Sequence, residues 1–230
     1  MSDPSLNRPH SGDEPLQNLE RLTETLIATR DLQRIFDAAL DALDHGIGAR
    51  RCSVLLFDSD DVMRFKAWRR ISDHYRAAVE GHTPWKRQDI GARPIMVEDV
   101  TGDSSLAAYL PVFERERIRA LAFIPLLTSS EVIGKFMLYY DEPHRFTADE
   151  ISAAQTIARH VALAVERART DKAFEKSREQ LAAILEGISE GITAQEPSGR
   201  LVFANRAAAE MIGLTIDEIM AVSPAEILRS

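Results

Sequence analysis

The sequence predicts an α+β fold that ends in one very long helix, and three observations favour this class. Apolar residues recur at threes and fours over residues 16–45, as on one face of a helix. From residue 148 to 188 there is no proline, and glycine occurs only at Gly187, so a helix can run uninterrupted. Four intervening segments have the length and apolar content of strands: residues 51–59, 62–70, 120–129 and 131–140.

Composition limits the function. The 230 residues are 45% hydrophobic and carry a net charge of −8, so the chain has a core but lacks the basic excess that nucleic-acid binding needs. The single cysteine excludes an internal disulfide and fits a reducing compartment. The best apolar run, residues 121–127, is too short to span a membrane, and no signal peptide opens the chain. We therefore expect a cytoplasmic chain with no membrane contact.

The first helices should follow a polar, disordered tail at residues 1–14. Two helices are expected to meet at residues 29–31, where Asp31 can cap the second. Gly46 and Gly48 allow the chain to leave that helix.

Two strands then meet at an acidic turn, residues 58–61. Simple alternation in the second strand places three apolar residues on one face: Met63, Phe65 and Ala67. The opposite face would carry two cations and a tryptophan: Arg64, Lys66 and Trp68. Such a face suits solvent or the mouth of a polar pocket.

The middle of the chain is expected to hold a short helix capped by Ser72 and ended by Gly81, a short strand at 94–100 and a helix at 105–116. The segments 120–129 and 131–140 are the most apolar, as central strands should be.

The long helix begins at a capping box formed by Thr147 and Glu150. Forty helical residues reach about 60 Å, which is more than one domain of this size covers. Two heptad-like series occur in different phases: Ile151, Ala154, Ala158, Val161, Val165 and Ala168, then Phe174, Ser177, Leu181, Ile184 and Ile188. The polar bridge between them favours a parallel coiled coil in a homodimer, with the phase change as a stutter.

Residues 16–170 resemble the GAF domains that precede bacterial sensor histidine kinases. The resemblance rests on "RCSVLLFDSDDVMRFKAWRR", "PIMVEDV" and "ALAFIPLLTSSEVIGKFMLYYDEPHRFTADE". It implies a six-stranded antiparallel sheet with helices on its faces, in a domain spanning 15–170 that includes an N-terminal dimer helix. Arg117 stands where the family often has glycine.

Residues 189–230 resemble the start of a PAS domain, preceded by a linker helix at 171–188. The segment "GITAQEPSGRLVFANRAAAEMIG" carries Asn205 and Gly213 at the positions where that family has Asn and Gly. About 40 of the roughly 100 residues of a PAS fold are present. We expect this sheet to be incomplete, and the segment to be partly disordered or held by a neighbouring molecule.

The sequence offers no catalytic residue. His160 lacks the neighbouring acid of a phosphorylated kinase histidine, and nucleotide-binding glycine boxes are absent. Cys52 alternates with Val54 and Leu56, which predicts core packing, and the GAF families that use thiols for bilin attachment or sulfoxide reduction carry other cysteine motifs. The scattered histidines predict no metal site.

A small-molecule site over the sheet is the remaining candidate. Six residues could surround a planar or anionic ligand through stacking and charge-assisted hydrogen bonds: Lys66, Trp68, His82, Trp85, Lys135 and Tyr139. The Asn-Lys-Phe-Asp-Glu signature of GAF domains that bind cyclic nucleotides matches only loosely, because Gly134 replaces its asparagine. In the alternative interpretation, Trp85 plugs the sheet and no ligand binds.

These observations favour a regulatory input module of a bacterial sensor histidine kinase, acting as a homodimer through its N- and C-terminal helices. Two alternatives stay open. The same module could precede a diguanylate cyclase, or it could be a dimerisation scaffold that senses nothing.

Overall fold

A computed structural model describes residues 22–89 and 91–221 of the chain. The chain divides into two compact units between Ala168 and Arg169. The tail predicted at residues 1–14 lies outside the described residues. No helix in the described part has both the length and the hydropathy needed to cross a bilayer.

The first unit is built on an antiparallel sheet with the strand order β2-β1-β5-β4-β3. Within the described residues this sheet has five strands, where the resemblance implied six. Their bounds are β1 Arg51–Phe57, β2 Met63–Arg69, β3 Ile95–Val97, β4 Ala120–Leu127 and β5 Val132–Tyr140. The α+β class and the central position of β4 and β5 are confirmed.

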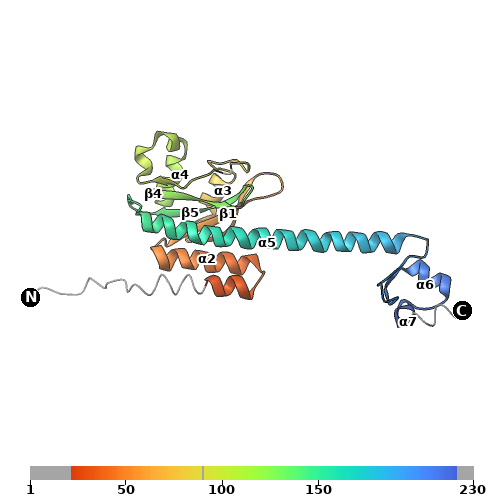
Figure 1. The fold of residues 1–230 in the computed structure, drawn as a ribbon. Coiled ribbons are helices and arrows are strands. Elements are labelled where there is room, and N and C mark those ends of the chain that lie inside the picture. The colour runs from red at the N-terminus through yellow and green to blue at the C-terminus, as the bar shows by residue number, and fades with distance from the viewer. Residues whose placement is uncertain (1–21, 90, 222–230) are drawn as a thin grey trace, which may run out of the picture. The chain divides into compact units, whose positions relative to one another are not determined.

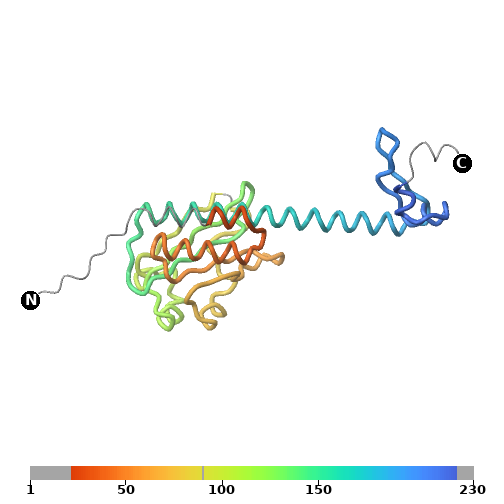
Figure 2. Tube along the Cα trace, turned by 90° about the horizontal axis from the view of Figure 1, so that it is seen from below, coloured from red at the N-terminus to blue at the C-terminus, as the bar shows by residue number. Residues whose placement is uncertain are grey.

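One face of the sheet is covered by three helical segments: residues 22–28, α2 (Leu32–Ile47) and the first half of α5 (Ala148–Gly187). Figure 1 shows α2 and the first half of α5 on the lower side of the sheet, and Figure 2, seen from below, shows the same helices in front of it. Asp31 caps α2 as predicted, accepting a hydrogen bond from the Gln33 amide at 2.9 Å. We call this side the helix face.

The other face lies under short elements, as Figure 1 shows for α3 and α4. They are α3 (Asp73–Val79), the 3₁₀ turns η1 (Val100–Gly102) and η2 (Ser104–Tyr109), and α4 (Leu110–Glu116). The predicted helix at 105–116 is therefore 3₁₀ in its first half. Arg117 ends α4 with φ 57°, a left-handed conformation that glycine adopts most easily. We call this side the loop face.

A β-bulge corrects the predicted faces of β2. Phe65 pairs with Leu55, whereas Ala67 pairs with Val54, so Lys66 is the extra residue. Met63 and Phe65 consequently pack on the loop face, while Ala67 is buried on the helix face. Alternation failed here because one inserted residue reverses the side of everything after it.

Helix α5 begins at the predicted capping box: Thr147 N donates to Glu150 Oε2 at 2.7 Å, and Glu150 N donates to Thr147 Oγ1 at 3.2 Å. Its buried residues all lie between Ala154 and Val165. In its second half, Phe174, Leu181 and Ile184 are exposed and Leu185 is half-buried.

The second unit contains the hairpin β6 (Thr193–Gln195) and β7 (Leu201–Ala204), followed by α6 (Arg206–Ile212) and α7 (Ile216–Ala221). Asn205 is its fully buried polar centre. The Asn205 Oδ1 atom accepts hydrogen bonds from the amides of Ile192 and Ala208, and Nδ2 donates to the carbonyls of Leu185, Ile188 and Glu190.

Candidate ligand site on the loop face

The candidate site is a small cavity between β1, β4 and β5 and the elements of the loop face. Its volume is about 20 Å³, and since one water needs about 10–15 Å³ it has room for one or two molecules of that size. Leu55, Phe123 and Met137 supply apolar wall, and His82, Tyr109 and Tyr139 bring polar atoms to it.

Lys135 is the unusual group of this cavity. Its side chain is buried, and Nζ donates to the carbonyl oxygen of His82 at 2.6 Å. Nζ also lies 5.0 Å from the ring centroid of Phe123, within range of a cation–π contact. Among the described residues Lys135 forms no ion pair, and burial lowers its pKa from 10.5 to about 7.

His82 and Tyr109 bridge the elements that cover the sheet. The Tyr109 hydroxyl and His82 Nδ1 are 3.0 Å apart, and their rings lie 4.6 Å apart between centroids. Burial, followed by the nearby Lys135 charge, lowers the pKa of His82. The imidazole is therefore neutral at neutral pH.

A pair of hydroxyl groups joins the neighbouring strands β1 and β5 on the loop face. Ser53 Oγ and the Tyr139 hydroxyl are 3.1 Å apart, and both side chains are buried. Tyr75 packs edge-on against Tyr139 with centroids 5.5 Å apart. Burial raises the pKa of both tyrosines, so both phenols stay protonated and can donate hydrogen bonds.

The structure brings together three of the six candidate residues: His82, Lys135 and Tyr139 line the cavity. Lys66 lies on the bulge and pairs with Asp58 at 2.6 Å. Trp68 is 37% exposed, and the Arg76 guanidinium carbon lies 3.6 Å from its ring centroid. Trp85 is buried edge-on against Phe123, with centroids 6.4 Å apart, and does not line the cavity.

Sequence reasoning missed Tyr75, Tyr109 and Phe123 as lining residues. Each is an ordinary apolar position of its own element, and the three are far apart in the chain. Only Phe123 could have been placed from the sequence, because strand alternation puts it on the same face of β4 as Leu121.

Two other predicted residues lie on the helix face. Cys52 is buried against α2, with Sγ 3.8 Å from the Leu40 carbonyl, and burial raises its thiol pKa to about 12. The chain's one thiol is therefore on the opposite side of the sheet from the cavity. His160 lies on α5, and its Nδ1 atom is buried without a hydrogen-bond partner among the described residues.

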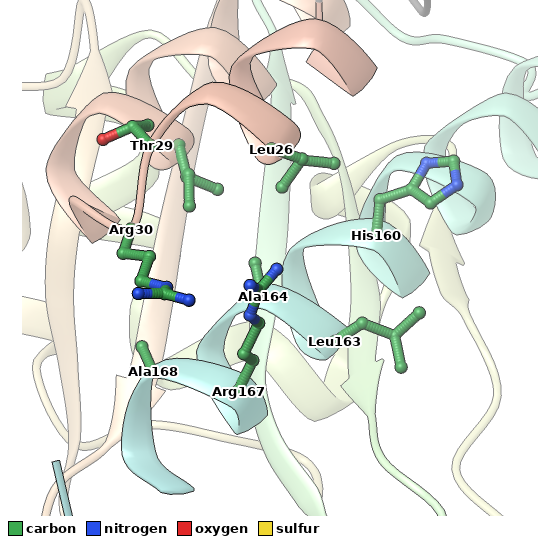
Figure 3. Close-up of a pocket in the computed structure, with 9 residues that line it drawn as sticks. Leu26, Thr29, Arg30, His160, Leu163, Ala164, Arg167 and Ala168 are labelled. Atoms are coloured by element: carbon green, nitrogen blue, oxygen red, sulfur yellow. The ribbon is translucent and has the colours of Figure 1, made fainter. Parts of the chain in front are cut away.

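His160 lines a groove of about 180 Å³ between residues 22–30 and α5. Figure 3 shows Arg30, from the connection that precedes α2, and Arg167 of α5 extending into it, with Leu26 and Ala164 nearby. Leu163 at its rim is 57% exposed. In the described residues no group of three or more His, Cys, Asp or Glu side chains is arranged to bind a metal ion.

The GAF domain family matches residues 29–166, more than half of the chain, and the chain belongs to this family. A PAS domain follows, matched over residues 179–229. No match was found among curated proteins.

Among solved structures, this chain is similar to a domain of a Sinorhizobium meliloti 1021 protein described as a two-component sensor histidine kinase. The two are 40% identical with a TM-score of 0.59, over 64% of this chain and 99% of the other. A GAF domain of a Coxiella burnetii phosphoenolpyruvate-protein phosphotransferase is 19% identical with a TM-score of 0.58, over 71% and 99% of the two chains.

The Thermosynechococcus elongatus PixJ GAF domain is also 19% identical, with a TM-score of 0.54, over 66% of this chain and 94% of the other. At this identity the likeness extends to the fold alone. The GAF and PAS units together make this chain a sensory module of signal transduction.

Proposed function

We propose that the chain is the input module of a bacterial sensor histidine kinase, in which the state of the loop-face cavity is passed along α5 to the PAS unit. The observation that carries this is the course of β5. The strand supplies Lys135 and Tyr139 to the cavity, and α5 starts eight residues after it ends, at Ala148. A change at the cavity thus has a short covalent route to the helix.

The first half of α5 supports this route because it packs on the same strands from the other side. Ala154, Ala158 and Val161 of α5 belong to one buried cluster with Phe136 and Leu138 of β5. Packed interiors transmit small displacements because they have little free volume. A shift of β5 would therefore move the helix.

The second half of α5 has the exposed apolar residues of a coiled-coil seam. Phe174, Leu181 and Ile184 are 67%, 59% and 61% exposed and follow a spacing of seven and three. Large exposed apolar side chains in register favour a partner helix. We infer that a second copy of the chain supplies it in parallel, making the module a homodimer.

The dimer is tested by replacing Phe174 and Leu181 with Glu and measuring mass by light scattering across a concentration series. We expect dimeric wild type and a monomeric double variant. Lys172→Glu is the matched control, because residue 172 occupies an outer heptad position. A wild-type chain that stays monomeric at high concentration contradicts the dimer.

Signal transfer is tested by inserting one residue at Asp171, between the two heptad phases. The insertion rotates the downstream seam by about 100° relative to the GAF unit. In the protein that carries this module with its kinase domain, we expect autophosphorylation to lose its dependence on input. Unchanged regulation contradicts transfer along α5.

One observation favours a second candidate, a dimerisation scaffold that senses nothing: the loop-face cavity is nearly filled by protein side chains. A thermal-shift screen separates the two when it includes, besides metabolite fractions, dissolved gases and other molecules small enough for a cavity of about 20 Å³. A scaffold predicts no shift with any fraction, whereas a sensor predicts a shift that Lys135→Met abolishes.

A further inference from the structure

Lys135 differs from every other lysine of the chain in its surroundings. The chain has five lysines, and Lys135 is the one whose side chain is buried. Lys66 is paired with Asp58, and the remaining three, Lys86, Lys172 and Lys176, are exposed. A chemistry that needs a desolvated amine would therefore select one position in this protein.

The contacts of Lys135 include no negative charge that would stabilise its protonated, cationic form. Its hydrogen-bond partner is a neutral carbonyl, that of His82, and the aromatic face of Phe123 lies 5.0 Å away. Burial without a carboxylate favours the neutral amine, and the pKa of about 7 means that much of the group is unprotonated at neutral pH. An unprotonated amine is a nucleophile.

The cavity beside the amine limits what can reach it. About 20 Å³ is too little for a sugar, nucleotide or amino acid, and walls such as Leu55, Phe123 and Met137 disfavour a hydrated ion. A small uncharged electrophile fits both limits. Carbon dioxide is linear, apolar and of the required size, and it reacts with neutral amines.

We propose that Lys135 is a reversible carbamylation site for carbon dioxide. The Nζ lone pair forms a bond to carbon while one C=O π pair moves to oxygen, and the nitrogen loses one proton. The net change is an amine and carbon dioxide giving a carbamate anion and a proton. No oxidant, metal or second substrate is needed.

The surroundings suit the product as well as the reactant. The carbamate nitrogen keeps one hydrogen, which can still donate to the His82 carbonyl. Tyr109 and Tyr139 line the same cavity, and either hydroxyl can donate to a new oxygen by exchanging its present partner, His82 Nδ1 or Ser53 Oγ. The neutral imidazole of His82 also lines it and can take up the released proton, which would pair an imidazolium with the carbamate.

Only the role of the carbamate as an input signal rests on the proposed sensory function, because it names an input for the same cavity. The chemistry itself can be measured on the chain alone. Failure to form the carbamate would leave the module and its helix route intact, and failure of the Asp171 insertion test would leave the carbamate intact.

The test traps carbamates on the purified chain by ethylation with triethyloxonium ion in ¹³C-labelled bicarbonate, followed by peptide mass spectrometry. We expect the ethoxycarbonyl adduct on Lys135 to exceed that on Lys86, Lys172 or Lys176 by more than tenfold, because an exposed lysine titrates near 10.4. The adduct should increase from pH 6 to pH 8.

The N-terminal α-amine of the purified chain is an internal control, since a free α-amine ordinarily has a pKa of about 8 and must be trapped if the reagent works. Lys135→Met and Lys135→Arg, checked for folding by circular dichroism, should lose the labelled ¹³C carbamate resonance assigned to this site. A trapped α-amine with no adduct on Lys135, or equal labelling of all lysines, overturns the proposal.

Discussion

The two faces of the central sheet share their strands but differ in what they bury. Under α2 and α5 the strands present apolar side chains, Phe136 among them, and the thiol of Cys52. Toward α3 and α4 the same strands bury Lys135 and Ser53, which are polar. Neighbours in sequence therefore have opposite surroundings, because successive strand residues point to opposite sides.

The helix face supports the fold, and the loop face holds the groups that can react or bind. The helix face is fixed by close packing, in which there is no room for change. The loop face contains hydrogen-bonded polar groups beside a small cavity, and it is covered by 3₁₀ turns and helices of seven residues or fewer. Variants on the two faces should consequently fail in different ways.

The largest effect is expected from Gly134→Ala on the helix face. An added Cβ would overlap the Leu55 carbonyl oxygen and lie 2.6 Å from Leu56 Cδ2, so the strands must separate. We expect a loss of about 3 kcal/mol in the free energy of unfolding, measured by urea denaturation. Gly46→Ala, which meets nothing within 4 Å, is the control and should change stability by no more than about 1 kcal/mol.

On the loop face, Lys135→Met should raise the free energy of unfolding at neutral pH, whereas Gly134→Ala lowers it. The folded-state pKa of about 7 lies below the ordinary 10.5, so the unfolded chain binds more protons between these values and wild-type stability rises with pH across them. From pH 7 to 9 we expect wild type to gain on the order of 2 kcal/mol relative to the variant.

Denaturant titrations at several pH values measure this difference, and Lys86→Met, at an exposed lysine, is the control. A flat difference between wild type and Lys135→Met over pH 7–10 would show that Lys135 is solvated in the folded protein.

The smallest effect is expected at the Ser53–Tyr139 pair. Ser53→Ala or Tyr139→Phe leaves one buried hydroxyl without this partner and should cost about 1 kcal/mol each. The double variant should cost less than the sum, giving a coupling energy in a double-mutant cycle. Strict additivity would mean that the two hydroxyls do not interact.

Local signals predicted the framework of the fold correctly. The Asp31 cap, the Ser72 cap and the Thr147–Glu150 box are set by residues two or three positions apart, and all three form. The forty residues of α5 follow from the lack of a helix-breaking residue. These features depend on short-range geometry, which a sequence displays directly.

The site was less predictable because it depends on tertiary register. The bulge at Lys66 is invisible in the alternation of β2, and it separates Ala67 from Met63 and Phe65. The burial of Lys135 requires knowing that the loop after α3 folds back to place the His82 carbonyl above β5. The hydrogen bond that holds this loop to β5 joins residues 53 positions apart.

The Asn205 side chain of the second unit has a mechanical consequence. Its amide is bonded at once to the last turn of α5, to the residues that follow that turn and to the first turn of α6. These hydrogen bonds stiffen the connector at residues 188–192, so that it cannot absorb torsion by bending. Any twist arriving at Leu185 must rotate the start of the PAS fold with it.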